Sequence, residues 1–235
     1  MRFFIVVGLL GLGFLLYAVI PNLYYRNKSP HIVKRFDSSN SIFLTFDDGP
    51  DIRYTLELLD LLKDYNIKAT FFMVAEKMED NYNIVNRMIS EGHGLGIHSY
   101  SHKSAWLSFP WQTKKDFEES LKVFKKFNYS VEYFRPPWGT FNLFTHYYCK
   151  KYGLKTILWT LNAKDWSKKT TPDYIVNKIL DNIKFGDIIV LHDSNGAENA
   201  PRNTIKALET IIPSLIERGF NFKTINNGIR SGVNE

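Results

Sequence analysis

Four polar residues in two short motifs have the types and spacing of a metal site. Asp47 and Asp48 stand together in TFDDGP, and His98 and His102 stand four residues apart in HSYSH. Zn²⁺ in proteins accepts imidazole nitrogen and carboxylate oxygen at about 2.0 to 2.2 Å, and a catalytic site keeps one position for water. One aspartate and two histidines would form such an open site, and the metal in it would activate water for hydrolysis.

Each motif also has an ordinary structural explanation. Asp-Asp-Gly-Pro is a common turn, because Asp tolerates unusual backbone angles and Gly adopts positive φ. Two histidines at i and i+4 are often just one face of a solvated helix. Their rings would align if residues 99–102 formed a helical turn. The motifs therefore indicate chemistry only through their place in the fold.

Apolar segments alternate with amphipathic ones along most of the chain. Seven segments are predicted as strands: 42–46, 69–74, 95–97, 131–135, 154–159, 187–191 and 220–225. Six segments are predicted as helices: 54–65, 83–91, 113–127, 143–152, 172–182 and 203–218. Strands separated by helices predict a parallel β/α arrangement, and a chain of this length can close it into a barrel.

The predicted strands end next to polar residues. In β/α architectures the reactive groups lie at the carboxyl ends of the strands. We therefore expect six residues from distant segments to meet on one rim. They are Asp47 and Asp48 after the first strand, His98 after the third, Arg135 closing the fourth, Asp165 past the fifth and His192 after the sixth.

The composition is that of one globular catalytic domain. The chain has 235 residues, of which 44% are hydrophobic, enough for one substantial core. Its net charge is +6, but the basic residues are scattered in pairs and match no nucleic-acid-binding motif, so we expect no nucleic-acid partner. Cys149 is the only cysteine, which excludes an internal disulfide.

The first segment differs from the rest in character. Residues 3–20 carry no charge and, at about 1.5 Å per residue, would span roughly 27 Å as a helix, nearly the thickness of a bilayer core. We predict a membrane anchor or signal-like segment at 1–26, a polar linker at 27–39 and the catalytic domain at 40–235. No clear cleavage site follows the apolar run, which favours an uncleaved anchor over a cleaved signal peptide that would yield a secreted form.

The orientation of the anchor is harder to predict from its flanking charges. Arg2 lies before the apolar run, whereas Arg26, Lys28, Lys34 and Arg35 lie after it. The positive-inside rule would place the domain in the cytoplasm, whereas the function inferred below places it on the extracellular face.

Five ordered blocks of the sequence together resemble one enzyme family. They are TFDDGP at 45–50, HSYSH at 98–102, RPPWG at 135–139, KDW at 164–166 and LHD at 191–193. Over residues 40–226 the chain resembles a polysaccharide deacetylase of the NodB-like group, carbohydrate esterase family 4. Five matches in order are far more specific than any single one.

The resemblance implies a distorted (β/α)7-type barrel, with fewer strands than the eightfold form, and it implies a role for each residue of the site. The metal ligands would be Asp48, His98 and His102. The general base would be Asp47, oriented by Arg135, and the general acid would be His192, oriented by Asp165. Trp138 would line the sugar groove and offer a backbone N–H to the oxyanion, Leu191 would line the acetyl pocket, and Trp166 is a further aromatic that we expect in the groove.

The implied reaction removes N-acetyl groups from a glycan that contains N-acetylglucosamine, in peptidoglycan or a related cell-surface polymer. Zn²⁺ is the leading metal, but the same ligands also accept Co²⁺, Ni²⁺ or Mn²⁺. No obligate protein partner is inferred. Three positions depart from the family pattern, and none removes a catalytic group: Asn162 in place of a frequent aspartate, Lys103 in place of a frequent proline and Trp138 in place of a common tyrosine.

Two other functions remain open at this point. One is a metal-dependent hydrolase of a different C–N amide or of O-acetyl esters, which would need the same metal, base and acid. The other is a carbohydrate-binding pseudoenzyme, which should have lost at least one catalytic residue. The chain retains all five of these residues: Asp47, Asp48, His98, His102 and His192.

Overall fold

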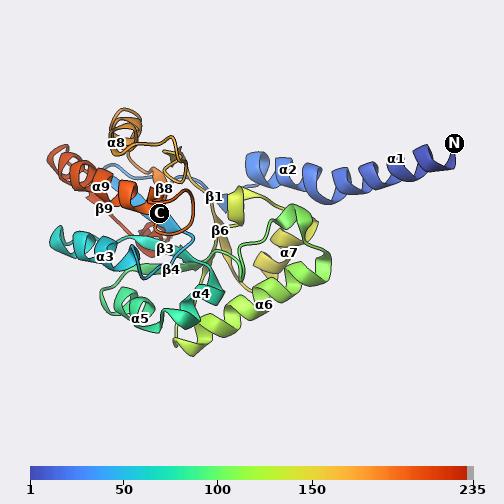
Figure 1. Ribbon diagram of the computed structural model, residues 1–235, viewed down its shortest axis with the longest axis horizontal. Helices are drawn as coiled ribbons and strands as arrows, with labels where there is room; N and C mark the ends of the chain where they lie inside the picture. The colour runs from blue at the N-terminus through green and yellow to red at the C-terminus, as the bar shows by residue number, and fades with distance from the viewer. Residues whose placement is uncertain (232–235) are drawn as a thin grey trace.

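A curled sheet of parallel strands forms the centre of the protein (Figure 1). The computed structural model describes residues 1–231. The strands are β1 (Ile32–Val33), β2 (Ser41–Asp47), β3 (Thr70–Met73), β4 (Gly94–Ile97), β5 (Tyr133–Phe134), β6 (Lys155–Ile157), β7 (Leu161–Asn162), β8 (Ile188–His192) and β9 (Asn221–Phe222). Their order is β1-β6-β5-β4-β3-β2-β8-β7, and β9 pairs with β2. Within the described residues no pairing joins β1 to β7, so the barrel is open.

Helices follow most of the strands and cover the outer face of the sheet (Figure 1). They are α3 (Thr55–Asp64), α4 (Ala75–Asp80), α5 (Tyr82–Ser90), α6 (Pro110–Lys126), α7 (Leu143–Lys151), α8 (Pro172–Leu180) and α9 (Ala200–Glu217). The last helix, α10 (Ile225–Ser231), instead packs Ile225 with Phe43 and Phe72 on the inner face of the sheet. Their periodicity determines which side packs inward: Leu58 and Leu62 of α3 and Leu208 of α9 join the core. Asn142 begins α7, where its side-chain oxygen accepts hydrogen bonds from two backbone N–H groups.

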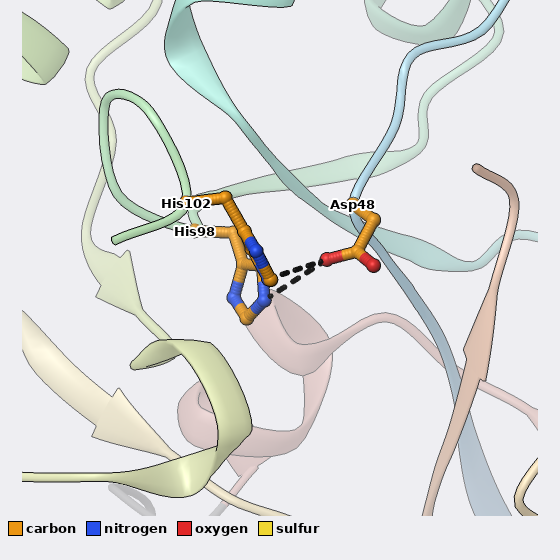
Figure 2. Close-up of side chains that lie close together, drawn as sticks. All are labelled: Asp48, His98 and His102. Atoms are coloured by element: carbon orange, nitrogen blue, oxygen red, sulfur yellow. Dashed lines mark ion pairs between the residues drawn. The ribbon is translucent and has the colours of Figure 1, made fainter. Parts of the chain in front are cut away.

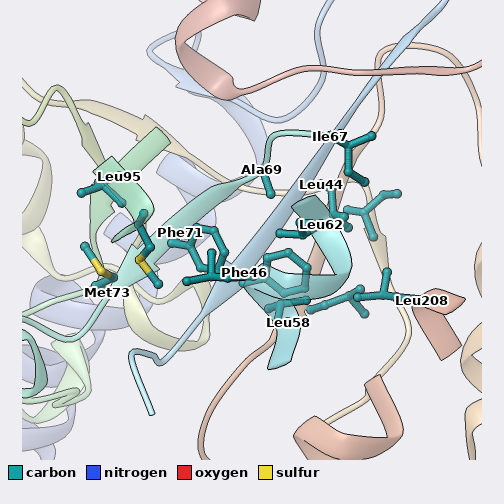
Figure 3. Packing of buried hydrophobic residues seen from close by; sticks show 14 of the residues in the cluster. Leu44, Phe46, Leu58, Leu62, Ile67, Ala69, Phe71, Met73, Leu95 and Leu208 are labelled. Carbon is teal, nitrogen blue, oxygen red and sulfur yellow. The ribbon is translucent and has the colours of Figure 1, made fainter. Parts of the chain in front are cut away.

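Strand residues alternate between two apolar clusters on opposite faces of the sheet. Leu44 and Phe46 of β2 face the helices and belong to the larger cluster (Figure 3). Phe43 faces the other way and packs with Phe72 and Ile188 in a smaller cluster that fills the barrel interior. All seven residues of β2 are buried, as expected for a parallel strand covered on both faces.

The same alternation brings polar side chains to the rim. On the interior face of β2, Phe43 is followed by Thr45 and then Asp47, and the register aligns these three with Ile188, Val190 and His192 of β8. The interior therefore changes along the strands from apolar at the amino ends to polar at the carboxyl ends.

A glycine in β4 makes room for this interior packing. A Cβ at Gly96 would lie 2.5 Å from the Phe72 ring, closer than atoms can approach. The guanidinium of Arg135 in turn lies over Phe72, with its Cζ 4.0 Å from the centroid of the Phe72 ring. The missing side chain of Gly96 thus leaves space for the aromatic ring that supports the site.

The structure confirms the predicted parallel β/α barrel and each of the predicted strands and helices, with shifted ends. Within the described residues, the strands β1 and β7, the helices α4 and α10, and two 3-10 turns (Ala105–Leu107 and Pro137–Gly139) were not predicted. Each has at most seven residues, too few to show a clear period. Residues 99–102 do not form the helical turn that would align the two imidazoles, because Ser99 and His102 both adopt positive φ, 69° and 52°.

The amino-terminal segment is one long helix that projects from the domain (Figure 1). It comprises α1 (Arg2–Phe14), a π-helical turn (Leu15–Val19) and α2 (Ile20–Lys28). Its most apolar window is only 6% buried against the rest of the protein. By length and composition this helix could cross a membrane, and a signal sequence would have the same character.

Helix α3 offers a matched test of the core packing. Leu58 is 1% exposed and Leu56, on the same helix, is 36% exposed. Because Leu58→Ala leaves a cavity, we expect it to lower the free energy of unfolding by about 2 to 5 kcal/mol in urea titrations followed by circular dichroism. Leu56→Ala should cost less than about 1 kcal/mol. Equal losses would contradict the packing described here.

Candidate active site

Asp48, His98 and His102 bring three potential metal-binding atoms together at the rim (Figure 2). Oδ1 of Asp48 lies 2.9 Å from Nε2 of His102 and 3.4 Å from Nε2 of His98. The donor atoms of the three residues all lie within 4.8 Å of one another. The two motifs, fifty residues apart, therefore meet as predicted.

The backbone around this cluster is held in uncommon conformations. Asp48, Ser99 and His102 all have positive φ, which side chains other than glycine rarely adopt. The Ser99 hydroxyl accepts a hydrogen bond of 2.7 Å from the backbone N–H of His102, which stabilises the turn. Such strain costs about 1 to 3 kcal/mol per residue and is concentrated at functional sites.

The hydrogen bonding of the cluster suits a cation. Nδ1 of His98 lies 2.8 Å from the carbonyl oxygen of Arg135, which can only accept, so Nδ1 carries a proton and Nε2 can offer its lone pair. The buried Oδ1 of Asp48 has no hydrogen-bond partner among residues 1–231. An anionic oxygen facing two imidazole nitrogens fits a divalent metal ion.

Asp47 is paired with a completely buried arginine. Nη1 of Arg135 donates to Oδ1 of Asp47 at 2.6 Å and to Thr45 Oγ1 at 2.8 Å. Burial lowers the pKa of Arg135 and the Asp47 carboxylate opposes that effect. The second oxygen of Asp47, Oδ2, lies 3.8 Å from Nε2 of His98 and so faces the metal-binding cluster.

His192 forms a second pair with Asp165. Oδ1 of Asp165 lies 2.8 Å from Nδ1 of His192, and Oδ2 accepts from the backbone N–H of His192 and the hydroxyl of Thr204, each at 2.8 Å. Burial alone would lower the pKa of His192, but the Asp165 carboxylate outweighs it and raises this pKa to about 9. His192 can therefore carry a proton at neutral pH.

These groups open into one cavity of about 510 Å³. Its lining includes Asp47, Asp48, His98, His102 and His192, together with Arg26, Trp138, Trp159, Asn162, Trp166, Val190, Asn195 and Gly196. Trp138 packs against His102 with ring centroids 4.4 Å apart. Trp138 and Trp166 are about half exposed, so both offer aromatic surface to whatever enters.

Comparisons with known proteins agree with this geometry. The family model for polysaccharide deacetylase matches residues 34–157. A peptidoglycan-N-acetylglucosamine deacetylase of Bacillus cereus is 36% identical over 191 residues, which are 80% of this chain and 88% of that protein. The chain belongs to the polysaccharide deacetylase family.

Solved structures extend the comparison to the fold. The crystal structure of a peptidoglycan N-acetylglucosamine deacetylase matches with a TM-score of 0.80 and 29% identity, covering 87% of this chain and 95% of the other. A family 4 acetyl xylan esterase from Clostridium thermocellum, solved with a cobalt ion, matches with a TM-score of 0.72 and 33% identity over 79% and 88% of the two chains. The family resemblance and the barrel predicted from the sequence are thus confirmed.

The structure of this deacetylase places one predicted site residue elsewhere. Leu191 is fully buried in the large cluster between β8 and the helices and does not line the cavity. Residues two apart on a strand point to the same face of the sheet. His192 faces the cavity, so Val190 shares its face and Leu191 points to the opposite one. Val190 therefore lines the cavity, and the prediction for Leu191 was wrong by one residue.

Arg26 is a cavity residue that the sequence reasoning missed. It comes from α2, and its Nη1 lies 3.3 Å from the carbonyl oxygen of Gly139 and 3.5 Å from that of Trp138. Its guanidinium also lies 5.9 Å from the centroid of Trp159. Nothing in the sequence signals this contact, because Arg26 is more than 110 residues from the loop that it touches.

Asp193 supports the turn that carries Asp48. Its side chain lies directly beneath Gly49, where a Cβ would come within 2.2 Å of Oδ2. The same oxygen accepts a hydrogen bond of 2.6 Å from the Thr55 hydroxyl, and burial raises the pKa of Asp193 to about 7. The LHD motif contained this residue, but only the structure shows that it packs against the metal-binding turn.

The cluster predicts how substitutions should affect metal binding by the deacetylase. Asp48→Ala or His102→Ala removes one of three donor atoms, so we expect retained metal to fall by at least about tenfold in elemental analysis after dialysis. Asp47→Asn should keep its metal, because Asp47 is outside the cluster. Undiminished metal in both cluster variants, with circular dichroism unchanged, would contradict the assignment.

Proposed function

We propose that this chain removes N-acetyl groups from N-acetylglucosamine units of peptidoglycan or a related cell-surface glycan. The observation that carries this proposal is the convergence on one cavity of a metal-binding cluster, an arginine-paired Asp47 and a carboxylate-paired His192. Hydrolysis of an amide needs a base to activate water and an acid to protonate the departing amine. The relatives named above supply the substrate class.

Asp47 is proposed as the general base. Arg135 occupies Oδ1 and fixes the plane of the carboxylate, so Oδ2 is left to accept a proton from water near the cluster. Because the guanidinium is completely buried, it cannot turn to solvent and leave the carboxylate free to rotate. Arg135 would thus be a positioning residue.

Asp48, His98 and His102 are proposed as the ligands of a divalent cation. When bound, such an ion would polarise the acetyl carbonyl and make water more acidic. Zn²⁺ suits two imidazoles and one carboxylate best, and Co²⁺, Ni²⁺ and Mn²⁺ fit the same donors. The cobalt in the related acetyl xylan esterase supports this breadth.

His192 is proposed as the general acid. An amine leaves poorly unless it is protonated, and the Asp165 carboxylate keeps the ring protonated at neutral pH. With Nδ1 fixed by Asp165, Nε2 is the nitrogen that can donate to the leaving group. Thr204 holds the other carboxylate oxygen, so Asp165 has little freedom to move.

Trp138 and Trp166 are proposed as sugar-binding residues. Both are about half exposed at the cavity, and a flat indole can stack on the apolar face of a pyranose. Trp138 adopts φ of 55°, as the central residue of a tight turn (Pro137–Gly139). Its backbone N–H is the proposed donor to the oxyanion.

The long amino-terminal helix is proposed as an uncleaved membrane anchor with the catalytic domain outside the cell. We divide the chain into this anchor at 1–26, a linker at 27–39 that contributes the edge strand β1 to the sheet, and the catalytic domain at 40–235. A cell-wall substrate requires the extracellular side. The basic residues after the helix favour the opposite orientation. We give the location of the substrate more weight than these flanking charges.

Hydrolysis of O-acetyl esters is a second candidate, favoured by the 33% identity to an acetyl xylan esterase. Esters release an alcohol, which needs less help from an acid than an amine does. The two activities should therefore depend differently on His192. A catalytically silent carbohydrate-binding protein has less support, because Asp47, Asp48, His98, His102 and His192 are all present and line one cavity.

The proposed function predicts acetate release by the metal-loaded full chain from peptidoglycan or from oligomers of N-acetylglucosamine. Asp47→Asn should lower kcat by about 10² to 10⁴ while retaining metal, because the base is lost. Asp64→Asn, on the exposed end of α3, is the matched control and should keep full activity. Release only from acetylated xylan would favour the esterase, and full activity after removal of the metal would refute the mechanism.

The pKa of His192 predicts the alkaline side of the pH profile. A general acid must be protonated, so activity should persist below about pH 9 and decline as the pH rises through the raised pKa of His192. Asp165→Asn removes the largest of the attractions that raise this pKa, leaving the weaker ones of Asp47 and Asp48 against the opposing effect of burial. The alkaline limb of kcat should then move to lower pH. An unmoved limb would show that another group sets it.

A further inference from the structure

An apolar loop lies beside the amino-terminal helix. The segment 106–111, here called the apolar loop, has the sequence WLSFPW and carries no charge. Leu107 is 81% exposed, Phe109 57% and Trp111 65%. The rings of Phe109 and Trp111 stack with centroids 4.8 Å apart and planes within 5°. An exposed cluster of apolar side chains of this kind marks a surface that contacts a membrane or another molecule.

The helix and the apolar loop touch directly. Phe14 packs edge to face on Trp106 with centroids 6.0 Å apart, and the Tyr17 hydroxyl donates a hydrogen bond of 2.6 Å to the carbonyl oxygen of Ser108. A groove of about 550 Å³ runs between them, lined by Leu9, Leu10, Gly13, Phe14 and Tyr17 on one side and by residues 106–110 and Phe144 on the other. The loop thus continues the apolar surface of the helix.

The contacts between helix and apolar loop show how deep the loop would lie in a bilayer that the helix crosses. Phe14 lies six residues before Ile20, the last residue of the apolar run, which corresponds to about 9 Å of helix. If this run crosses a bilayer, the loop lies level with its outer hydrocarbon and headgroup region. Interfacial apolar segments enter membranes by about 5 to 10 Å, and tryptophan is enriched at that level.

We propose that the apolar loop inserts into the outer leaflet as a second membrane contact of the catalytic domain. The inference rests on the proposed anchor and not on the proposed reaction. The bilayer is the favoured occupant, because the loop is continuous with the helix Arg2–Lys28, whose length and composition suit lipid. The exposed Lys114 and Lys115 follow in α6, where they can meet anionic headgroups.

This second contact would determine how high the active site stands above the membrane. A domain held to the membrane by one helix alone can change its tilt relative to the bilayer, whereas a second contact fixes this tilt. Arg26 is six residues beyond Ile20, about 9 Å along the axis, and it lines the catalytic cavity. The cavity would then open close to the headgroups, where it would reach the membrane-proximal layer of the glycan.

The test uses the full chain in vesicles of equal parts phosphatidylcholine and phosphatidylglycerol. An environment-sensitive fluorophore is attached to a thiol introduced by Leu107→Cys in the apolar loop. Leu12→Cys reports on the helix, and Tyr174→Cys, half exposed on α8, is the control. Cys149 can stay, because it is buried and burial raises its pKa to about 12.

We expect the label at position 107 to lose most of its emission to acyl-chain nitroxide lipids, as the label at position 12 does. The label at position 174 should be quenched only by aqueous iodide. If position 12 is quenched by the lipids while position 107 behaves like position 174, the loop proposal is overturned and the anchor stands. If position 12 also reports water, the anchor fails and the loop proposal falls with it. Acetate release by the same samples tests the reaction separately.

Discussion

The buried pair of Arg135 and Asp47 is the interaction on which the arrangement of the site depends. Arg135 is completely inaccessible to water, so its charge must be balanced inside the barrel. It reaches Asp47 and Thr45 on β2 and, through Nε, the carbonyl oxygen of Ile157 on β6. Its own carbonyl oxygen accepts a hydrogen bond from Nδ1–H of His98. One residue therefore sets the position of the proposed base and the orientation of a proposed metal ligand.

This pair also explains why the interior of the barrel is stratified. A buried ion pair is tolerated when its remaining donors and acceptors are satisfied, and removing one partner typically costs about 3 to 5 kcal/mol. Phe72 covers one face of the guanidinium, and β strands supply carbonyl oxygens around it. Apolar packing below and polar groups above thus meet at Arg135, which couples stability to the geometry of the rim.

The rim itself is made of turns whose backbones are locally unfavourable. Positive φ occurs at Asp48, Ser99, His102, Trp138, Lys164 and Asn195, each in a loop at or next to the cavity. Each of these turns follows a strand and leads into a helix, and contacts such as Asp193 beneath Gly49 keep them in place. Side chains can then converge on the cavity without rearranging when substrate enters, which is the purpose of preorganisation.

The sequence by itself determined the parallel β/α class, the strands and helices with clear periods, and the residues that meet at the rim. These follow from local patterns, because strand ends and motif order do not depend on remote contacts. Only the tertiary structure decided which of Leu191 and Val190 faces the cavity, since a shift of one residue turns a strand side chain to the opposite face. It also decided the positive-φ turn at His102, the support of Gly49 by Asp193, and the approach of Arg26 to the cavity. Each of these depends on atoms brought together across long stretches of chain, and no local pattern records them.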